Sequence, residues 1–65
     1  MFLRLTDLDN NLQLINIQPI DGICLGQTKH GEVFTKICFE SGIYFAAKET
    51  VSEISLLLQK AGKVI

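Results

Sequence analysis

The side chains best suited to chemistry lie in one polar, glycine-containing stretch, residues 26–32. It holds the only histidine, His30, with Lys29 directly before it and Glu32 two residues later. A histidine and a carboxylate this close could form a general-base pair, but proton transfer needs a pocket that holds the substrate and shifts a pKa. A loop tip provides no such pocket. We therefore predict no enzyme activity, and Lys29, His30 and Glu32 remain a candidate ligand-binding loop.

The two cysteines offer a second possible chemistry. Cys24 and Cys38 each lie within an apolar run, residues 23–25 and 37–39. Such neighbours are typical of buried free thiols, with a disulfide as the alternative. They also argue against the adjacent base and the solvent access that a nucleophilic cysteine needs. With one histidine and no C-x-x-C pair, the chain offers too few ligands for a zinc site.

A third possibility is a calcium site near the N-terminus. Asp7, Asp9, Asn10 and Asn11 bring carboxylate and amide oxygens together. Their spacing is not that of an EF-hand loop, which also needs a glycine and a distal bidentate glutamate. Asp and Asn are common turn formers, so these residues predict the tip of a hairpin. The glycines are too dispersed for a phosphate-binding loop, and we expect neither a metal nor a cofactor.

Length and composition indicate a single small globular domain, residues 1–65. Of its 65 residues, 48% are hydrophobic and 20% are charged, which is typical of a chain that folds around a core. A domain of this size buries only about 60% of the surface that its unfolded chain exposes. Small scaffolds commonly add a disulfide, a metal or a partner subunit. Because the first two are not expected here, self-association is the predicted source of further burial.

Charge and hydropathy limit the expected cellular location of the protein and the classes of partner that it could bind. Arg4, Asp7 and Asp9 interrupt the N-terminus before any apolar stretch of signal-peptide length. No apolar stretch approaches the ~20 residues that cross a membrane, so we expect a cytoplasmic protein without a membrane segment. The formal charge is −1 and the six basic residues are scattered. Nucleic-acid binding relies on a basic surface, so nucleic acid is not an expected partner.

Hydrophobic alternation with a period of two residues predicts a series of short strands. Asparagine, proline and glycine turn signals separate them. The alternation slips between Leu14 and Ile15, which predicts a bulge or a strand end at that point. The predicted strands cover residues 2–8, 12–17, 20–25, 33–39 and 43–48.

A helix is predicted over residues 51–61. Thr50 and Glu53 match the capping box, in which each side chain bonds the other residue's backbone amide. Apolar residues then recur at helical spacing, and Gly62 stands where a left-handed C-terminal cap belongs. The predicted fold class is therefore α+β, with about five short antiparallel strands in a curved sheet or small open barrel and one C-terminal helix.

More apolar residues are present than one covered sheet face needs. Several fall on the sides of the elements opposite to the predicted core. In a barrel they would form a second core face, whereas in an open sheet they would mark an interface, since monomers rarely expose a large apolar patch. The candidate interface residues are Phe2, Phe34, Tyr44, Leu56, Val64 and Ile65, together with Ile15 or Ile17.

Three segments are distinctive in their order along the chain: LRLTDL (residues 3–8) before an Asn turn, NIQPIDGI (residues 16–23) and KETVSEI (residues 48–54). Together they resemble the small FlbD-type flagellar and swarming motility proteins. In that family a short first strand and turn lead to an Asn-Pro segment and later to a Lys-Glu-Ser helix start. The resemblance implies a non-catalytic accessory or assembly role.

The predicted function is a non-catalytic protein-binding, assembly or regulatory module that associates with itself and with another protein. The alternative is a small inhibitor or sequestering protein, of the kind that phages and mobile elements encode. Such a protein blocks a host enzyme or holds a nucleotide signal at a subunit interface. The nucleotide would need one or more of Arg4, Lys29, Lys36 and Lys48 gathered with Phe34 or Tyr44 around a cleft.

Overall fold

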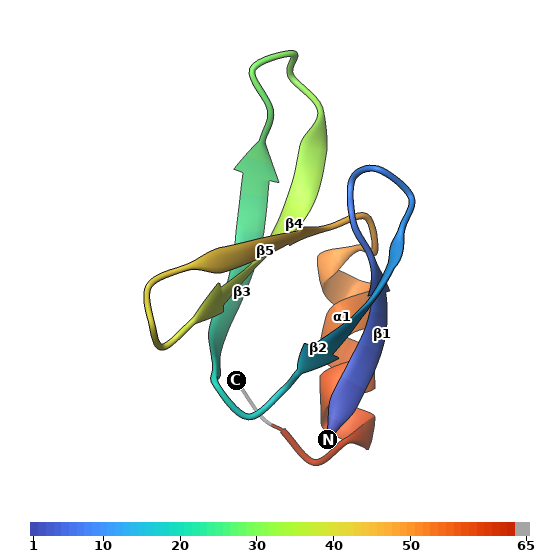
Figure 1. Cartoon of the computed structure of the whole chain (residues 1–65), viewed down its shortest axis with the longest axis vertical. Helices are drawn as coiled ribbons and strands as arrows, with labels where there is room; N and C mark the ends of the chain where they lie inside the picture. The colour runs from blue at the N-terminus through green and yellow to red at the C-terminus, as the bar shows by residue number, and fades with distance from the viewer. Residues whose placement is uncertain (64–65) are drawn as a thin grey trace.

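The computed structural model describes residues 1–63 and confirms an α+β fold of five short antiparallel strands followed by one helix (Figure 1). The strands form two sheets, and neither closes into a barrel. One sheet pairs β1 with β2, and the other has the order β3-β4-β5. The elements are β1 (Phe2–Thr6), β2 (Leu12–Asn16), β3 (Ile20–Gln27), β4 (Val33–Phe39), β5 (Tyr44–Ala47) and α1 (Val51–Lys60).

The β1–β2 hairpin turns at the predicted Asp and Asn residues. Asn10 adopts a left-handed backbone with φ of 67°. The Asp7 carboxylate accepts the backbone amides of Asp9 and Asn11, each at 2.9 Å. A hydrogen bond from the Gln13 side chain, with those from the turn amides, lowers the pKa of Asp7 below its ordinary value. The interpretation of this segment as a hairpin tip is confirmed.

The bulge or strand end predicted between Leu14 and Ile15 is wrong. The β1–β2 register runs without interruption from one end of the hairpin to the other. Leu14 is exposed on the outer face and Ile15 is half-buried on the inner face. The two adjacent apolar residues therefore point to opposite faces of one regular strand. The register shift lies instead in β3, between Ile20 and Gly22.

The β3–β4 hairpin contains the two longest strands of the fold. Its strands have eight and seven residues, and the molecule measures 35 Å along its longest axis. The free end of the hairpin extends past the helix and past β5 (Figure 1). On the inner face of the sheet Thr35 and Ile37 are buried, whereas Lys36 lies on the outer face, 4.5 Å from the centre of the Tyr44 ring.

The core lies where the helix meets the inner faces of both sheets. Ile54 and Leu58 are the buried residues of α1. Ile17, which the sequence placed among the candidate interface residues, is 6% exposed and belongs to this core. The buried apolar cluster consists of Leu3, Leu5, Ile17, Ile20, Ile37, Ala47, Ile54 and Leu58.

Both ends of α1 are capped as the sequence predicts. The Thr50 hydroxyl accepts the Glu53 amide at 3.1 Å, and the Glu53 carboxylate accepts the Thr50 amide at 2.9 Å. At the other end Gly62 has φ of 83°. Gly62 donates its amide to Gln59 and Lys63 donates to Leu58, the two bonds of a Schellman motif. A helix of ten residues is marginal without such caps.

Removing the N-terminal cap is expected to cost about 1 kcal/mol. For a domain of this size, Thr50→Ala should therefore lower the melting temperature by about 4–8 °C in a thermal unfolding experiment. Ser52→Ala is the matched control, because Ser52 is an exposed position in the same first turn. Equal melting temperatures for the two variants would contradict a stabilising role of the cap.

Candidate interaction site

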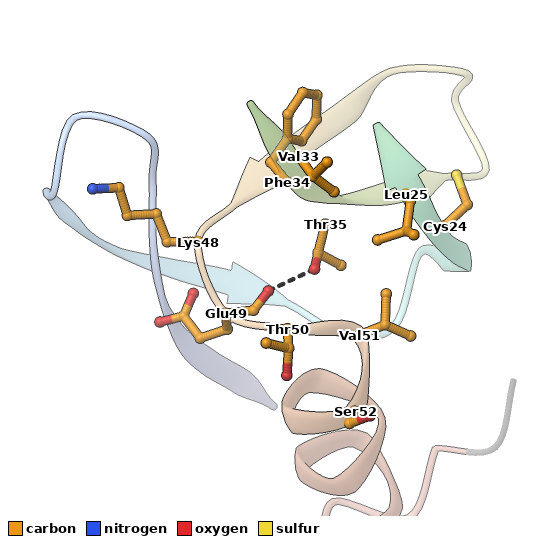
Figure 2. Close-up of a pocket in the computed structure, with 10 residues that line it drawn as sticks. All are labelled: Cys24, Leu25, Val33, Phe34, Thr35, Lys48, Glu49, Thr50, Val51 and Ser52. Carbon is orange, nitrogen blue, oxygen red and sulfur yellow. Dashed lines mark hydrogen bonds between the residues drawn. The ribbon is translucent and has the colours of Figure 1, made fainter. Parts of the chain in front are cut away.

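A cleft of about 490 Å³ opens between the β3–β4 hairpin and the N-terminus of α1 (Figure 2). Leu25 and Val33 face it from the hairpin, and Val51 faces it from the first turn of the helix. The segment that joins β5 to α1 forms its base. The ten lining residues are Cys24, Leu25, Val33, Phe34, Thr35, Lys48, Glu49, Thr50, Val51 and Ser52.

Two hydrogen-bond clusters hold the base of the cleft. The Thr35 hydroxyl, the one buried polar side chain among the described residues, donates to the Glu49 carbonyl at 2.6 Å (Figure 2). The Glu49 carboxylate accepts the Thr6 amide at 2.9 and 3.0 Å and the Thr6 hydroxyl at 2.8 Å. Lys48 donates its amide to the Thr6 carbonyl at 2.9 Å. These bonds fasten the end of the first sheet to the segment that starts the helix.

Val33 and Leu25 form the apolar wall of the cleft. They lie on the same face of the sheet as buried Thr35 and Ile37. They are nevertheless 64% and 67% exposed. The free end of the hairpin extends past the helix, where no element of residues 1–63 covers these two side chains. The alternation of apolar residues could not reveal this exposure. It predicts which face of a strand is apolar, but not how much of that face another element covers.

Phe34 lies across the backbone of Gly26 on the opposite face of the hairpin. A Cβ built at position 26 would lie 2.6 Å from Cζ of Phe34, whereas one at Gly22 would meet nothing within 4 Å. The glycine therefore gives the ring a flat surface on which to pack, a known way of stabilising glycine in a strand.

Gly26→Ala is expected to destabilise the protein by about 1 kcal/mol, because the new methyl group must displace the Phe34 ring. Gly22→Ala is the control in the same strand, and its effect should be neutral or slightly stabilising because the unfolded chain loses freedom. Urea unfolding of both variants measures the difference. A Gly26→Ala protein as stable as Gly22→Ala would mean that the ring contact contributes nothing.

The candidate interface residues lie on three separate parts of the fold. Phe2 is 62% exposed on the outer face of the first sheet. Phe34 and Tyr44 share the outer face of the second sheet, with Lys36 between them in the register. Leu56 is 53% exposed on the helix. Val64 and Ile65 lie outside the described residues, and Ile15 packs partly against the core.

The candidate ligand loop forms the tip of the β3–β4 hairpin. Lys29, His30 and Glu32 are all exposed. The Thr28 hydroxyl accepts the backbone amides of His30 and Glu32 at 3.3 and 3.1 Å, and Gly31 has φ of 87°. The loop is thus a regular, locally bonded turn that stands at the far end of the hairpin.

The cysteines are free thiols, as predicted, but Cys24 is exposed and Cys38 is only half-buried. The prediction of buried thiols is wrong because both side chains point to the outer face of the sheet, which the helix of the described residues leaves uncovered. Partial loss of hydration, and then the neighbouring Cys24 thiol, raise the pKa of Cys38. The raised pKa disfavours the thiolate form of Cys38.

Among residues 1–63, no three His, Cys, Asp or Glu side chains gather as a metal site requires. The helix in this part of the chain is not long and apolar enough to cross a membrane. Comparisons with protein-family models, curated proteins and solved structures returned no match. The cleft and the exposed apolar side chains are the features of the described residues that bear on function.

Proposed function

We propose that the chain is a small, non-catalytic protein-binding and assembly module that associates with itself and with another protein. The observation that carries this proposal is the apolar wall of the cleft. Leu25 and Val33 leave about two-thirds of their surfaces in water, although they lie on the core face of their strands. A cytoplasmic accessory role of the flagellar type, as the resemblance to FlbD-type proteins implies, is consistent with it.

The energetic argument favours a covered state for this wall. Burying one leucine or valine side chain contributes roughly 1.5–3 kcal/mol. In a chain of 65 residues this is a large fraction of the free energy of unfolding, which is about 3–10 kcal/mol on a per-residue basis. A partner that covers Leu25 and Val33 would therefore stabilise the fold while it binds. The segment at the base of the cleft is already fixed by the Thr35 and Glu49 hydrogen bonds, so little ordering opposes docking.

Concentration-dependent amide spectra test self-association at this site. We expect ¹H–¹⁵N signals of Leu25, Val33 and Val51 to shift or broaden as the protein is concentrated. Amides of the exposed outer face of the β1–β2 hairpin, such as that of Leu14, should stay in place. Identical spectra at every concentration would remove self-association from the proposal, and changes confined to the β1–β2 hairpin would place the interface elsewhere.

One observation favours the alternative of a nucleotide-sequestering inhibitor. Lys48 and Phe34 line the same cleft, and they are one cation and one aromatic ring of the set that such a ligand would need. The Lys48 ammonium already donates to the Asn10 side chain, and Lys36 packs over Tyr44 away from the cleft. Titration with a nucleoside monophosphate decides the matter. Signals that shift in the wild type and not in Lys48→Met would support the alternative, and unchanged signals would exclude it for that ligand.

A further inference from the structure

The free edge of the second sheet is formed by β3, the longest strand of the fold. β3 stands at the end of the order β3-β4-β5, so no strand of the described chain pairs with its outer side. After the register shift at its start, its residues Gly22 to Gln27 include no charged side chain and no proline. Natural edge strands usually carry a charge, a proline or a bulge that blocks pairing. This part of β3 is therefore open to another strand.

The backbone groups that face outward can be assigned from the hairpin. Thr28 donates its amide to the Glu32 carbonyl at 2.8 Å, which makes these two residues a hydrogen-bonded pair. In an antiparallel ladder, hydrogen-bonded and non-hydrogen-bonded pairs alternate. Counting back along the β3–β4 register, Ile23, Leu25 and Gln27 fall in non-hydrogen-bonded pairs. Their N–H and C=O groups point away from β4, toward the free edge.

We infer that a second copy of this chain pairs with β3, antiparallel and about a two-fold axis that passes between the two Cys24 residues. This inference rests on the self-association proposed above and assigns the surface that mediates it. The two sheets would join into one continuous six-stranded sheet with β3 next to its symmetry mate. An isologous contact of this kind uses the same surface on both subunits.

The register centred on Cys24 allows backbone hydrogen bonds between the two strands and places compatible side chains opposite each other. Ile23 of one copy lies opposite Leu25 of the other on the inner face, and these residues present the outward-facing backbone groups that hydrogen bond. Asp21 lies opposite Gln27, so no like charges meet. Gly22 lies opposite Gly26, and a Cβ at Gly22 would meet nothing within 4 Å, whereas the Phe34 ring already covers Gly26. The free edge of β3 is therefore complementary to that of a second copy, both in its side chains and in the positions of its outward-facing N–H and C=O groups.

The exposed Leu25 side chain adds apolar area to the strand pair. A specific dimer buries about 600 Å² or more on each subunit, and the whole chain exposes 4523 Å². The Leu25 side chain stands on the inner face beside the new ladder, whereas Val33 lies on β4, on the other side of β3. Pairing along β3 therefore places Ile23 of the second copy beside Leu25 and covers this part of the apolar wall.

Cys24 gives this geometry a direct test. In the inferred register the two Cys24 residues face each other in a non-hydrogen-bonded pair, where Cα atoms are about 4.5 Å apart. That separation lies within the range of about 4.4–6.8 Å found in disulfides. An azodicarboxamide oxidant can take two electrons and two protons from the thiols, forming one S–S bond as its N=N bond becomes a hydrazine.

The experiment uses the Cys38→Ser protein, in which Cys24 is the sole thiol. We expect the oxidant to convert it to a covalent dimer, seen as a doubled mass on a non-reducing gel and by mass spectrometry. The control carries Cys24→Ser, Cys38→Ser and Gln27→Cys, which places a thiol on the same strand away from the axis. Because proximity raises the effective concentration of the facing thiols, the first protein should give about tenfold more dimer than the control.

A charge substitution completes the test and separates its outcomes. Leu25→Lys should abolish the dimer, whereas Leu12→Lys, at a position that is 65% exposed on the other sheet, should leave it intact. A wild-type protein that is monomeric would contradict the proposed self-association itself. A dimer that survives Leu25→Lys and gives no Cys24 cross-link would overturn only the pairing through β3.

Discussion

Ile37→Ala is expected to remove a large part of the unfolding free energy and to lower the melting temperature by about 8 °C or more. Ile37 is 0% exposed, lies in the central strand of the second sheet and belongs to the cluster that joins both sheets to the helix. Truncating a buried isoleucine to alanine costs about 2–5 kcal/mol, from the lost transfer free energy and the cavity left behind. A domain of 65 residues has about 3–10 kcal/mol of unfolding free energy in total.

Val33→Ala is the matched control for this prediction. Val33 lies in the same strand and on the same face, but it is 64% exposed because the hairpin extends past the helix. Its truncation should change the unfolding free energy by less than about 0.5 kcal/mol in a dilute, monomeric sample. Far-ultraviolet circular dichroism during urea and thermal unfolding measures both variants. Similar losses at the two positions would mean that the free end of the hairpin is as well packed as the core.

Glu49→Ala is expected to destabilise the protein by about 1.5–3 kcal/mol, the usual range for hydrogen bonds to a charged group. The half-buried carboxylate accepts the Thr6 amide and the Thr6 hydroxyl at 2.8–3.0 Å, and it thereby ties the first sheet to the start of the helix. Removing it leaves the Thr6 amide without that acceptor. The free energy of unfolding in urea measures the loss.

Two further variants separate the hydrogen bonds from a general effect of charge. Glu49→Gln keeps one oxygen acceptor, so its loss of unfolding free energy should fall between those of the wild type and Glu49→Ala. Glu32→Ala removes an exposed carboxylate at the hairpin tip and should be neutral within about 0.5 kcal/mol. If Glu32→Ala cost as much as Glu49→Ala, the effect would come from net charge and not from the bonds to Thr6.

Local sequence signals predicted the elements of this fold well. The capping box at Thr50, the left-handed Gly62 and the turn at Asn10 are all properties of a few adjacent residues, and each is confirmed by a bond or a backbone angle. The alternation in β4 likewise assigned Ile37 to the core face. Such features are fixed by backbone geometry and hydrogen bonding over one or two turns of chain, so they can be deduced without the tertiary structure.

The features that form the candidate site depend on contacts between distant residues. Glu49 bonds Thr6 across 43 positions of sequence, and nothing in either neighbourhood signals that contact. The exposure of Leu25 and Val33 follows from how far a hairpin extends beyond a helix. The exposure of Cys24 has a similar cause, since an apolar run in a strand is buried only where another layer covers its face. These relationships are set by the packing of whole elements and leave no local pattern.

The most direct test of the central proposal is the molar mass of the wild-type protein in solution. Light scattering coupled to size exclusion should be run over a range of protein and salt concentrations. We predict a mass that rises from 7.2 kDa toward twice that value with increasing concentration, with little dependence on salt because the proposed contact is apolar and backbone-mediated. A mass that stays at that of one chain at every concentration would contradict self-association, and it would leave the cleft as a site for a different protein.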